Sequence, residues 1–79
     1  MKQLNFTKSQ LEIIYRERLD ELIEAAEGYY HLAKMLATNH STVKGWVDRG
    51  RISKDGAKKV EKHKELGKTF KANYLRPDL

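Results

Sequence analysis

The 79-residue chain contains no cysteine, which excludes disulfide bonds, cysteine-ligated zinc sites and thiol nucleophiles. It also lacks long apolar runs, so we expect no membrane-spanning segment, and its first ten residues show no signal-peptide pattern. A chain of this length is expected to form one domain, residues 1–79, with a core too small for a deep catalytic pocket. We therefore expect a cytoplasmic protein of a bacterium or phage that is not an enzyme.

Charge is distributed unevenly along the chain. Residues 1–27 hold four basic and six acidic side chains, whereas residues 28–79 hold twelve basic and five acidic ones. The formal net charge of +5 therefore comes from the second part. A basic region beside an acidic one indicates a side that faces a polyanion, although a solvated surface explains the composition equally well.

The first predicted element is a long amphipathic helix over residues 8–26, with a bend or break near Glu17 left open. Thr7 and Gln10 have the spacing of a capping box at its start. Phe6 and Leu11 have the spacing of a hydrophobic staple. Apolar residues then recur at helical intervals on one face. These residues are Leu11, Ile14, Tyr15, Leu19, Leu22, Ile23 and Ala26.

Three shorter helices are predicted after the first, over residues 29–37, 39–48 and 54–65. Glycines 28, 50 and 67 are the expected helix stops, with Thr38 or Asn39 and then Ser53 as the expected N-caps. Residues 68–79 are predicted to form an irregular or short extended tail. The pattern as a whole predicts a compact all-α domain of four to five helices.

Residues 32–52 combine two short helices in a pattern typical of a helix-turn-helix. Ala33 must be small because the two helices cross there, and Leu36, Val43 and Trp46 fill the angle between them. The early outer face of the second helix is left free. Such a helix enters the major groove of DNA with its N-terminus first, and the base edges there differ for each base pair.

The motif resembles that of Cro/CI-type phage repressors, and most of all the small YdaS-like group of Cro proteins. The shared pattern is A-x-x-L-x-x-x-x-x-x-V-x-x-W followed by V-x-R-G-R, and the chain also closes on the family's LRPD at residues 75–78. The resemblance covers about residues 19–79 in order. The matching positions are Leu19, Leu22, Ile23, Gly28, Ala33, Leu36, Val43, Trp46, Val47, Arg49, Gly50 and Arg51.

This resemblance implies a lambda-repressor-like fold that binds operator DNA, represses transcription and often dimerises. The chain departs from the family pattern at three places. Ala37 stands where the turn usually has glycine, which costs roughly 1 kcal/mol if that residue is left-handed, unless the turn shifts toward Asn39. Thr38 replaces an aliphatic residue, and residues 1–18 extend beyond the family's usual start.

The helix-turn-helix at residues 29–48 supplies the candidate DNA contacts. His40, Ser41 and Lys44 are the candidates for base reading, and Gly45 either permits close approach to DNA or serves packing. Phosphate contacts are expected near the start of the first motif helix, at the turn and after the second helix. The candidates for backbone contact are Tyr30, His31, Asn39, Thr42, Arg49, Arg51 and Lys54.

For several other residues, a structural role has to be weighed against a role in binding. Trp46 and Tyr29 are predicted to lie in the core rather than to contact DNA. The lysine-rich run at residues 58–64 is either a nucleic-acid stripe or a solvated helix face. The three histidines lack the i, i+4 spacing and the third ligand that a metal site needs, so no metal is expected. Nor do we expect a cofactor or a small-molecule ligand.

The partners expected from the sequence are double-stranded operator DNA and a second copy of the chain. A homodimer would form through the N-terminal helix, at Phe6, Leu11, Ile14 and Tyr15, or through the tail, although Phe70 and Leu75 are expected to cover their own core. The alternative function is that of a protein-interaction module, such as an antitoxin or phage regulator that sequesters a protein partner.

Overall fold

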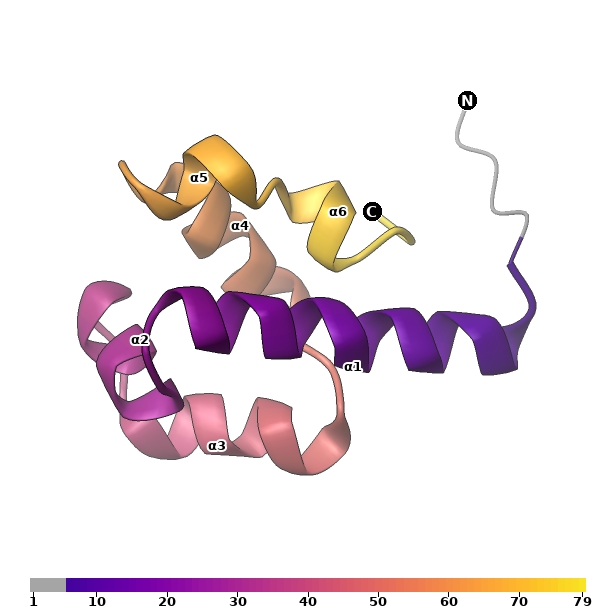
Figure 1. Ribbon diagram of the computed structural model, residues 1–79, viewed down its shortest axis with the longest axis horizontal. Coiled ribbons are helices and arrows are strands. Elements are labelled where there is room, and N and C mark those ends of the chain that lie inside the picture. Colours follow the sequence, from indigo (N-terminus) through magenta and orange to yellow (C-terminus); the bar gives the residue numbers. More distant parts are fainter. Residues whose placement is uncertain (1–5) are drawn as a thin grey trace.

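The computed structural model describes residues 6–79 and places them in six helices without a strand, so the predicted all-α fold is confirmed. The part of the N-terminal extension before Phe6 lies outside the described residues. Helix α1 runs through the middle of the molecule, with α3 on one side of it and α4, α5 and α6 on the other (Figure 1). The helices are α1 (Lys8–Ala25), α2 (Tyr29–Met35), α3 (His40–Arg49), α4 (Lys54–Lys62), α5 (Leu66–Thr69) and α6 (Ala72–Leu75).

Helix α1 begins at the predicted capping box. The Gln10 backbone N–H donates to Thr7 Oγ1 at 3.1 Å, and the Thr7 N–H donates to Gln10 Oε1 at 2.9 Å. The helix continues through Glu17 without the break that the sequence left open. In the part of the chain that the structure describes, neither α1 nor any other helix is long and apolar enough to cross a bilayer.

The ends of α1 and α2 each place a non-glycine residue in the left-handed region. Glu27 has φ 67°, so the left-handed position after α1 is Glu27 rather than Gly28, which has φ 119° and precedes α2. Ala37 has φ 55°, and the following N–H, of Thr38, donates to the Ala33 carbonyl at 2.9 Å. The turn has therefore not shifted toward Asn39, and Ala37 takes the strained conformation at a cost of about 1 kcal/mol.

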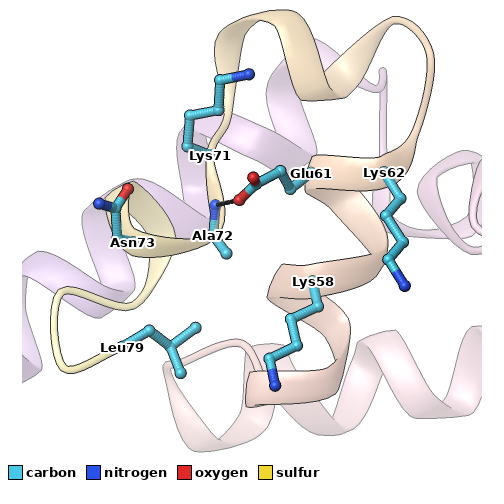
Figure 2. Close-up of a pocket in the computed structure, with 7 residues that line it drawn as sticks. All are labelled: Lys58, Glu61, Lys62, Lys71, Ala72, Asn73 and Leu79. Atoms are coloured by element: carbon cyan, nitrogen blue, oxygen red, sulfur yellow. Dashed lines mark hydrogen bonds between the residues drawn. The ribbon is translucent and has the colours of Figure 1, made fainter.

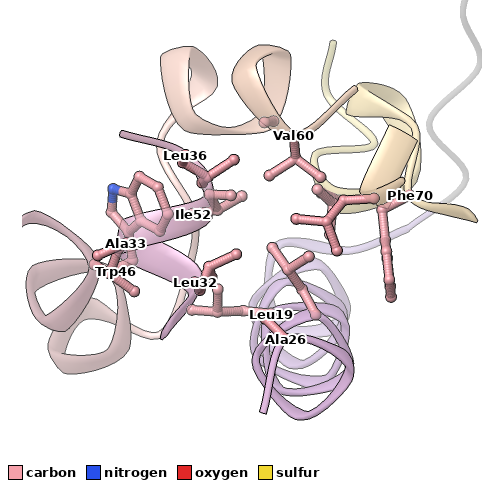
Figure 3. Close-up of a cluster of buried hydrophobic side chains, with 14 residues drawn as sticks. Leu19, Ala26, Leu32, Ala33, Leu36, Trp46, Ile52, Val60 and Phe70 are labelled. Carbon is pink, nitrogen blue, oxygen red and sulfur yellow. The ribbon is translucent and has the colours of Figure 1, made fainter. Parts of the chain in front are cut away.

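The core joins α1 to the helix-turn-helix and to the C-terminal helices (Figure 3). Trp46 of α3 is 2% exposed, which confirms its predicted place in the core. Gly56 of α4 packs so closely on the Trp46 ring that a Cβ there would clash with it. Tyr29 is half-buried against this core, also as predicted. The buried apolar residues of the cluster include Leu19, Leu22, Leu32, Leu36, Val43, Ile52, Val60, Phe70 and Leu75.

The C-terminal region differs from its prediction. Helix α4 ends at Lys62 rather than near residue 65, and residues 68–79 include helical turns instead of an extended tail. Gly67 does not end α4 but lies buried within α5, where a Cβ would clash with the Glu61 carbonyl. The chain can therefore fold back on α4 only because this residue has no side chain. His63 Nδ1 accepts from the Leu66 N–H at 3.2 Å and supports the same turn.

The closing LRPD segment is held by a network around Arg76. Its guanidinium donates to both carboxylate oxygens of Asp78, at 2.7 and 3.0 Å, and to the Ile52 carbonyl at 2.9 Å. The same guanidinium lies 4.8 Å from the centre of the Tyr15 ring. The hydrogen bonds from Arg76 lower the pKa of the Asp78 carboxyl. The end of the chain is thereby tied both to α1 and to the segment that follows α3.

Candidate nucleic-acid interface

Helices α2 and α3 form the predicted helix-turn-helix. Ala33 and Val43 are 2% and 0% exposed, so the residues between the two helices are fully packed. The opposite face of α3 is exposed at His40, Ser41 and Lys44. A ten-residue helix with one face in the core and the other in solvent can be presented to the major groove as a rigid element.

Lys44 has a partner that sequence reasoning missed. Its ammonium lies 3.4 Å from the Asp48 carboxylate, and both side chains are more than half exposed. An exposed i, i+4 pair contributes only about 0.3–0.5 kcal/mol, so a ligand can displace it. Asp48 adds a hydrogen-bond acceptor to this face, of the kind that pairs with the amino group of cytosine. The four-residue spacing was the signal that would have revealed the pair.

Tyr30 and His40 come together from different helices. Their ring centres are 4.9 Å apart with the planes inclined by 46°, and the Tyr30 side chain is well exposed. A residue assigned to phosphate contact therefore touches a residue assigned to base reading. Aromatic contact between the two helices restrains the His40 ring where α3 begins. No sequence pattern predicted this contact, because the two residues are separated by the turn.

One of the two ring nitrogens of His31 is already engaged in a hydrogen bond within the protein. Its Nδ1 lies 2.7 Å from the Ala26 carbonyl oxygen, near the end of α1. Since a carbonyl oxygen only accepts hydrogen bonds, Nδ1 carries the proton and donates. Only Nε2 of this ring is then left to contact a phosphate, so the role predicted for His31 is restricted to that atom.

Asn39 and Ser53 stand at the N-caps of α3 and α4 but differ in what their side chains do. Ser53 Oγ accepts from the Gly56 N–H at 2.9 Å, as predicted for a capping residue. The Asn39 side chain makes no capping hydrogen bond. Its amide, which is exposed, is consequently available to a phosphate, the second of the two roles expected for it.

Gly45 lies on the outer half of α3, near the side chain of Arg49. A Cβ at Gly45 would lie 3.3 Å from Arg49 Nη1, and its other close contacts are also atoms of that guanidinium. No core side chain is among them. Packing of the core therefore gives no reason for glycine here, which favours the close-approach interpretation.

Cationic groups collect where α3 ends and α4 begins. Arg49, Arg51 and Lys54 are all exposed. Within residues 6–79, none of the three has a carboxylate within 4 Å. Thr42 is exposed on the flank of α3 and lines a groove of about 440 Å³ together with Lys58 and Lys59 of α4. These four predicted backbone-contact residues thus lie on α3 or between it and the start of α4, and the lysine-rich run is a candidate addition to them.

A cavity of about 670 Å³ lies between α4 and α6 (Figure 2). Glu61 Oε1 accepts from the Ala72 N–H at 2.7 Å, so this carboxylate holds α6 against α4. Lys58, Lys62 and Lys71 also line the cavity. For residues 6–79, no cluster of three histidine or carboxylate side chains is placed to bind a metal ion.

The structure divides the candidate dimer contacts into buried and exposed residues. Tyr15 is only 8% exposed and packs under Arg76, so its side chain has little surface left for the dimer contact predicted for it. Leu11 and Ile14 are half-buried. Phe6 is 40% exposed, and Ile13, which was not predicted, is 57% exposed. Burial of Phe70 and Leu75 in their own core is confirmed, at 6% and 1% exposure.

Comparison with protein-family models, with curated proteins and with solved structures found no significant match. A functional assignment therefore depends on the side chains and geometry of the chain itself.

Proposed function

We propose that the chain is a sequence-specific, double-stranded DNA-binding transcriptional regulator, a Cro-like repressor of a phage or prophage. The observation that carries the proposal is the exposed outer face of α3, with His40, Ser41 and Lys44, on a helix whose inner face is fixed by Val43 and Trp46. Such a helix matches the width of the major groove. We propose the bacterial cytoplasm as its location.

Two sets of side chains would divide the work of binding. The outer face of α3, including Gly45, would read base edges, while residues around it would contact phosphates and supply most of the salt-dependent affinity. The backbone set comprises Tyr30, His31 through Nε2, Asn39, Thr42, Arg49, Arg51 and Lys54.

Duplex binding across a series of salt concentrations tests the proposal. Each phosphate neutralised by a lysine or arginine releases counterions, so the logarithm of the affinity should fall linearly with the logarithm of the salt concentration, by about 0.9 per contact. A steep slope is expected. Absence of duplex binding at low salt would contradict the proposal.

We further propose that the regulator binds a pseudo-palindromic operator as a homodimer through α1 and the residue before its cap. Phe6 and Ile13 expose apolar surface there, beside half-buried Leu11 and Ile14. A Phe6→Ser/Ile13→Ser variant should have the mass of a monomer in light scattering, in contrast to a dimeric parent. A parent that is monomeric both free and on DNA would rule this dimer out.

The same exposed apolar residues favour a second candidate, a module that sequesters a protein partner. Under this alternative, α1 binds another protein and α3 has no DNA to read. The two candidates differ in the salt experiment, because only the regulator binds duplex DNA with a steep salt dependence.

A further inference from the structure

A polar cleft of about 510 Å³ separates the first half of α1 from the end of α3. Figure 1 shows this part of α1 passing over the C-terminal end of α3. Three arginines line the cleft: Arg16 from α1, and Arg49 and Arg51 from the end of α3 and the turn after it. Arg16 belongs to the N-terminal extension, for which the helix-turn-helix motif supplies no role.

Arg16 is held against the backbone at the end of α3. A Cβ at Gly50 would lie 2.7 Å from Arg16 Nη2, and Gly50 is also left-handed, with φ 78°. The glycine therefore serves both the turn and the approach of the guanidinium. The partial negative charge at the C-terminus of α3 favours a cation at this place, and Arg49 and Arg51 line the same cleft as Arg16.

The cleft has an excess of positive charge that the protein does not neutralise. Within residues 6–79, none of its three arginines has a carboxylate within 4 Å. Glu12 is the acidic residue of the lining, and no hydrogen bond joins it to the arginines. Guanidinium groups present planar pairs of donors that match the oxygens of a phosphate.

The outer face of α3 cannot itself supply much attraction for phosphates. The positive charge of Lys44 lies beside the negative charge of Asp48 at 3.4 Å. Most of the attraction for the DNA backbone then has to come from cationic groups outside this face. The three arginines of the cleft are placed at one end of α3.

We propose that Arg16, Arg49 and Arg51 bind a phosphate of the DNA backbone, so that the N-terminal extension forms part of the DNA interface. This inference rests on the proposed function. It adds to that function a contact made by α1, outside the helix-turn-helix. The ligand is a phosphodiester group, and its recognition is independent of base sequence.

The first test compares Arg16→Gln with Lys68→Gln, which removes a charge from α5, on the opposite side of α1 from α3 (Figure 1). The probe is a duplex of mixed sequence, titrated at several salt concentrations. Arg16→Gln should bind about tenfold more weakly at low salt and should reduce the salt slope by about 1. Lys68→Gln should keep the parent slope, and Arg16→Lys should recover part of the loss. Equal slopes for Arg16→Gln and the parent would overturn the inference.

The second test gives a gain of binding, which a misfolded variant cannot mimic. Glu12→Gln removes the carboxylate from the cleft and should strengthen duplex binding about threefold at low salt. Glu17→Gln makes the same change on an exposed residue of α1 outside the cleft lining and is the matched control. If both variants changed the affinity equally, net charge alone would explain the effect and the phosphate site would be wrong.

The two proposals fail in different ways. If the parent protein shows no salt-dependent duplex binding, the DNA-binding function fails and takes the phosphate site with it. If the parent binds with a steep slope while Arg16→Gln and Glu12→Gln behave like their controls, only the phosphate site fails.

Discussion

The outer face of α3 and the C-terminal junction around Arg76 are both polar, but they use their polar groups in opposite ways. At the junction, the Arg76 guanidinium is shared among Asp78, the Ile52 carbonyl and the Tyr15 ring, and its side chain is only 12% exposed. On α3, Lys44 has one weak, exposed ion pair. The Ser41 side chain, also exposed, has no intramolecular hydrogen bond within residues 6–79.

This difference indicates which groups stabilise the fold and which are free to bind. Groups that are desolvated and paired in the folded protein contribute to stability, and removing one partner leaves the other unsatisfied. Groups that remain solvated cost nothing to leave unpaired and can exchange their water for a ligand. Two glycines show the same contrast between a residue fixed by the fold and one that is not. A side chain at Gly67 would clash with the backbone, whereas one at Gly45 would meet only the end of a flexible side chain.

The largest loss of stability is expected for Gly67→Ala at the C-terminal junction. The new Cβ would clash with the Glu61 carbonyl, which is backbone and cannot move without separating α5 from α4. Overpacking of this kind should lower the free energy of unfolding by about 3 kcal/mol, measured by urea denaturation. A variant as stable as the parent would show that this junction tolerates movement.

Asp78→Asn should lower stability at neutral pH by about 2 kcal/mol, because it weakens the charged hydrogen bonds from Arg76. The folded state lowers the pKa of Asp78, so its contribution is present above the unfolded pKa and is lost as pH falls through the folded pKa. The difference between variant and parent should therefore vanish in strong acid. Asp20→Asn, on the exposed side of α1, is the control and should change stability by less than about 0.5 kcal/mol.

Ala37→Gly should stabilise the protein by about 1 kcal/mol, since glycine adopts the left-handed conformation of this turn without strain. Ala25→Gly is the matched comparison, because Ala25 lies in the right-handed last turn of α1. That substitution should lower the melting temperature while Ala37→Gly raises it. If both lowered it, the strain assigned to Ala37 would be incorrect.

Gly45→Ala has the smallest expected effect on the fold but separates folding from function. Alanine is the better helix former, and only the Arg49 guanidinium must move, so stability should rise by roughly 0.5 kcal/mol. Duplex binding should nevertheless weaken, because the added methyl group keeps the helix away from the DNA. A variant that binds duplex DNA as tightly as the parent would remove Gly45 from the interface.

Local signals in the sequence predicted the first part of the fold well. The capping box at Thr7, the apolar face of α1 and the inward position of Trp46 all depend on residues a few positions apart. The C-terminal helices depend instead on distant contacts, such as Arg76 with Ile52 and Glu61 with Ala72. No periodicity in residues 68–79 encodes those contacts, so the tail was predicted incorrectly.

In the candidate site too, local sequence spacing predicts some features, whereas contacts between distant residues determine others. The exposed side of α3 follows from helical spacing alone, and the i, i+4 pair of Lys44 and Asp48 was accessible to the same reasoning. The neighbours Tyr30 and His40, and the approach of Arg16 to Gly50, arise only when separate helices pack together. Sequence reasoning therefore found the exposed face of α3 but missed the approach of α1 to the end of that helix.

A measurement of binding specificity tests whether α3 reads base sequence. A preferred duplex is first selected from a random pool by the parent protein at a stated salt concentration. Lys44→Ala and Ser41→Ala are then titrated against that duplex and a mixed-sequence duplex. We predict a selective loss on the preferred duplex, of about 1–3 kcal/mol per lost base contact, with binding to the mixed duplex much less affected. An equal loss of affinity for both duplexes would contradict the assignment of α3 as the reading helix.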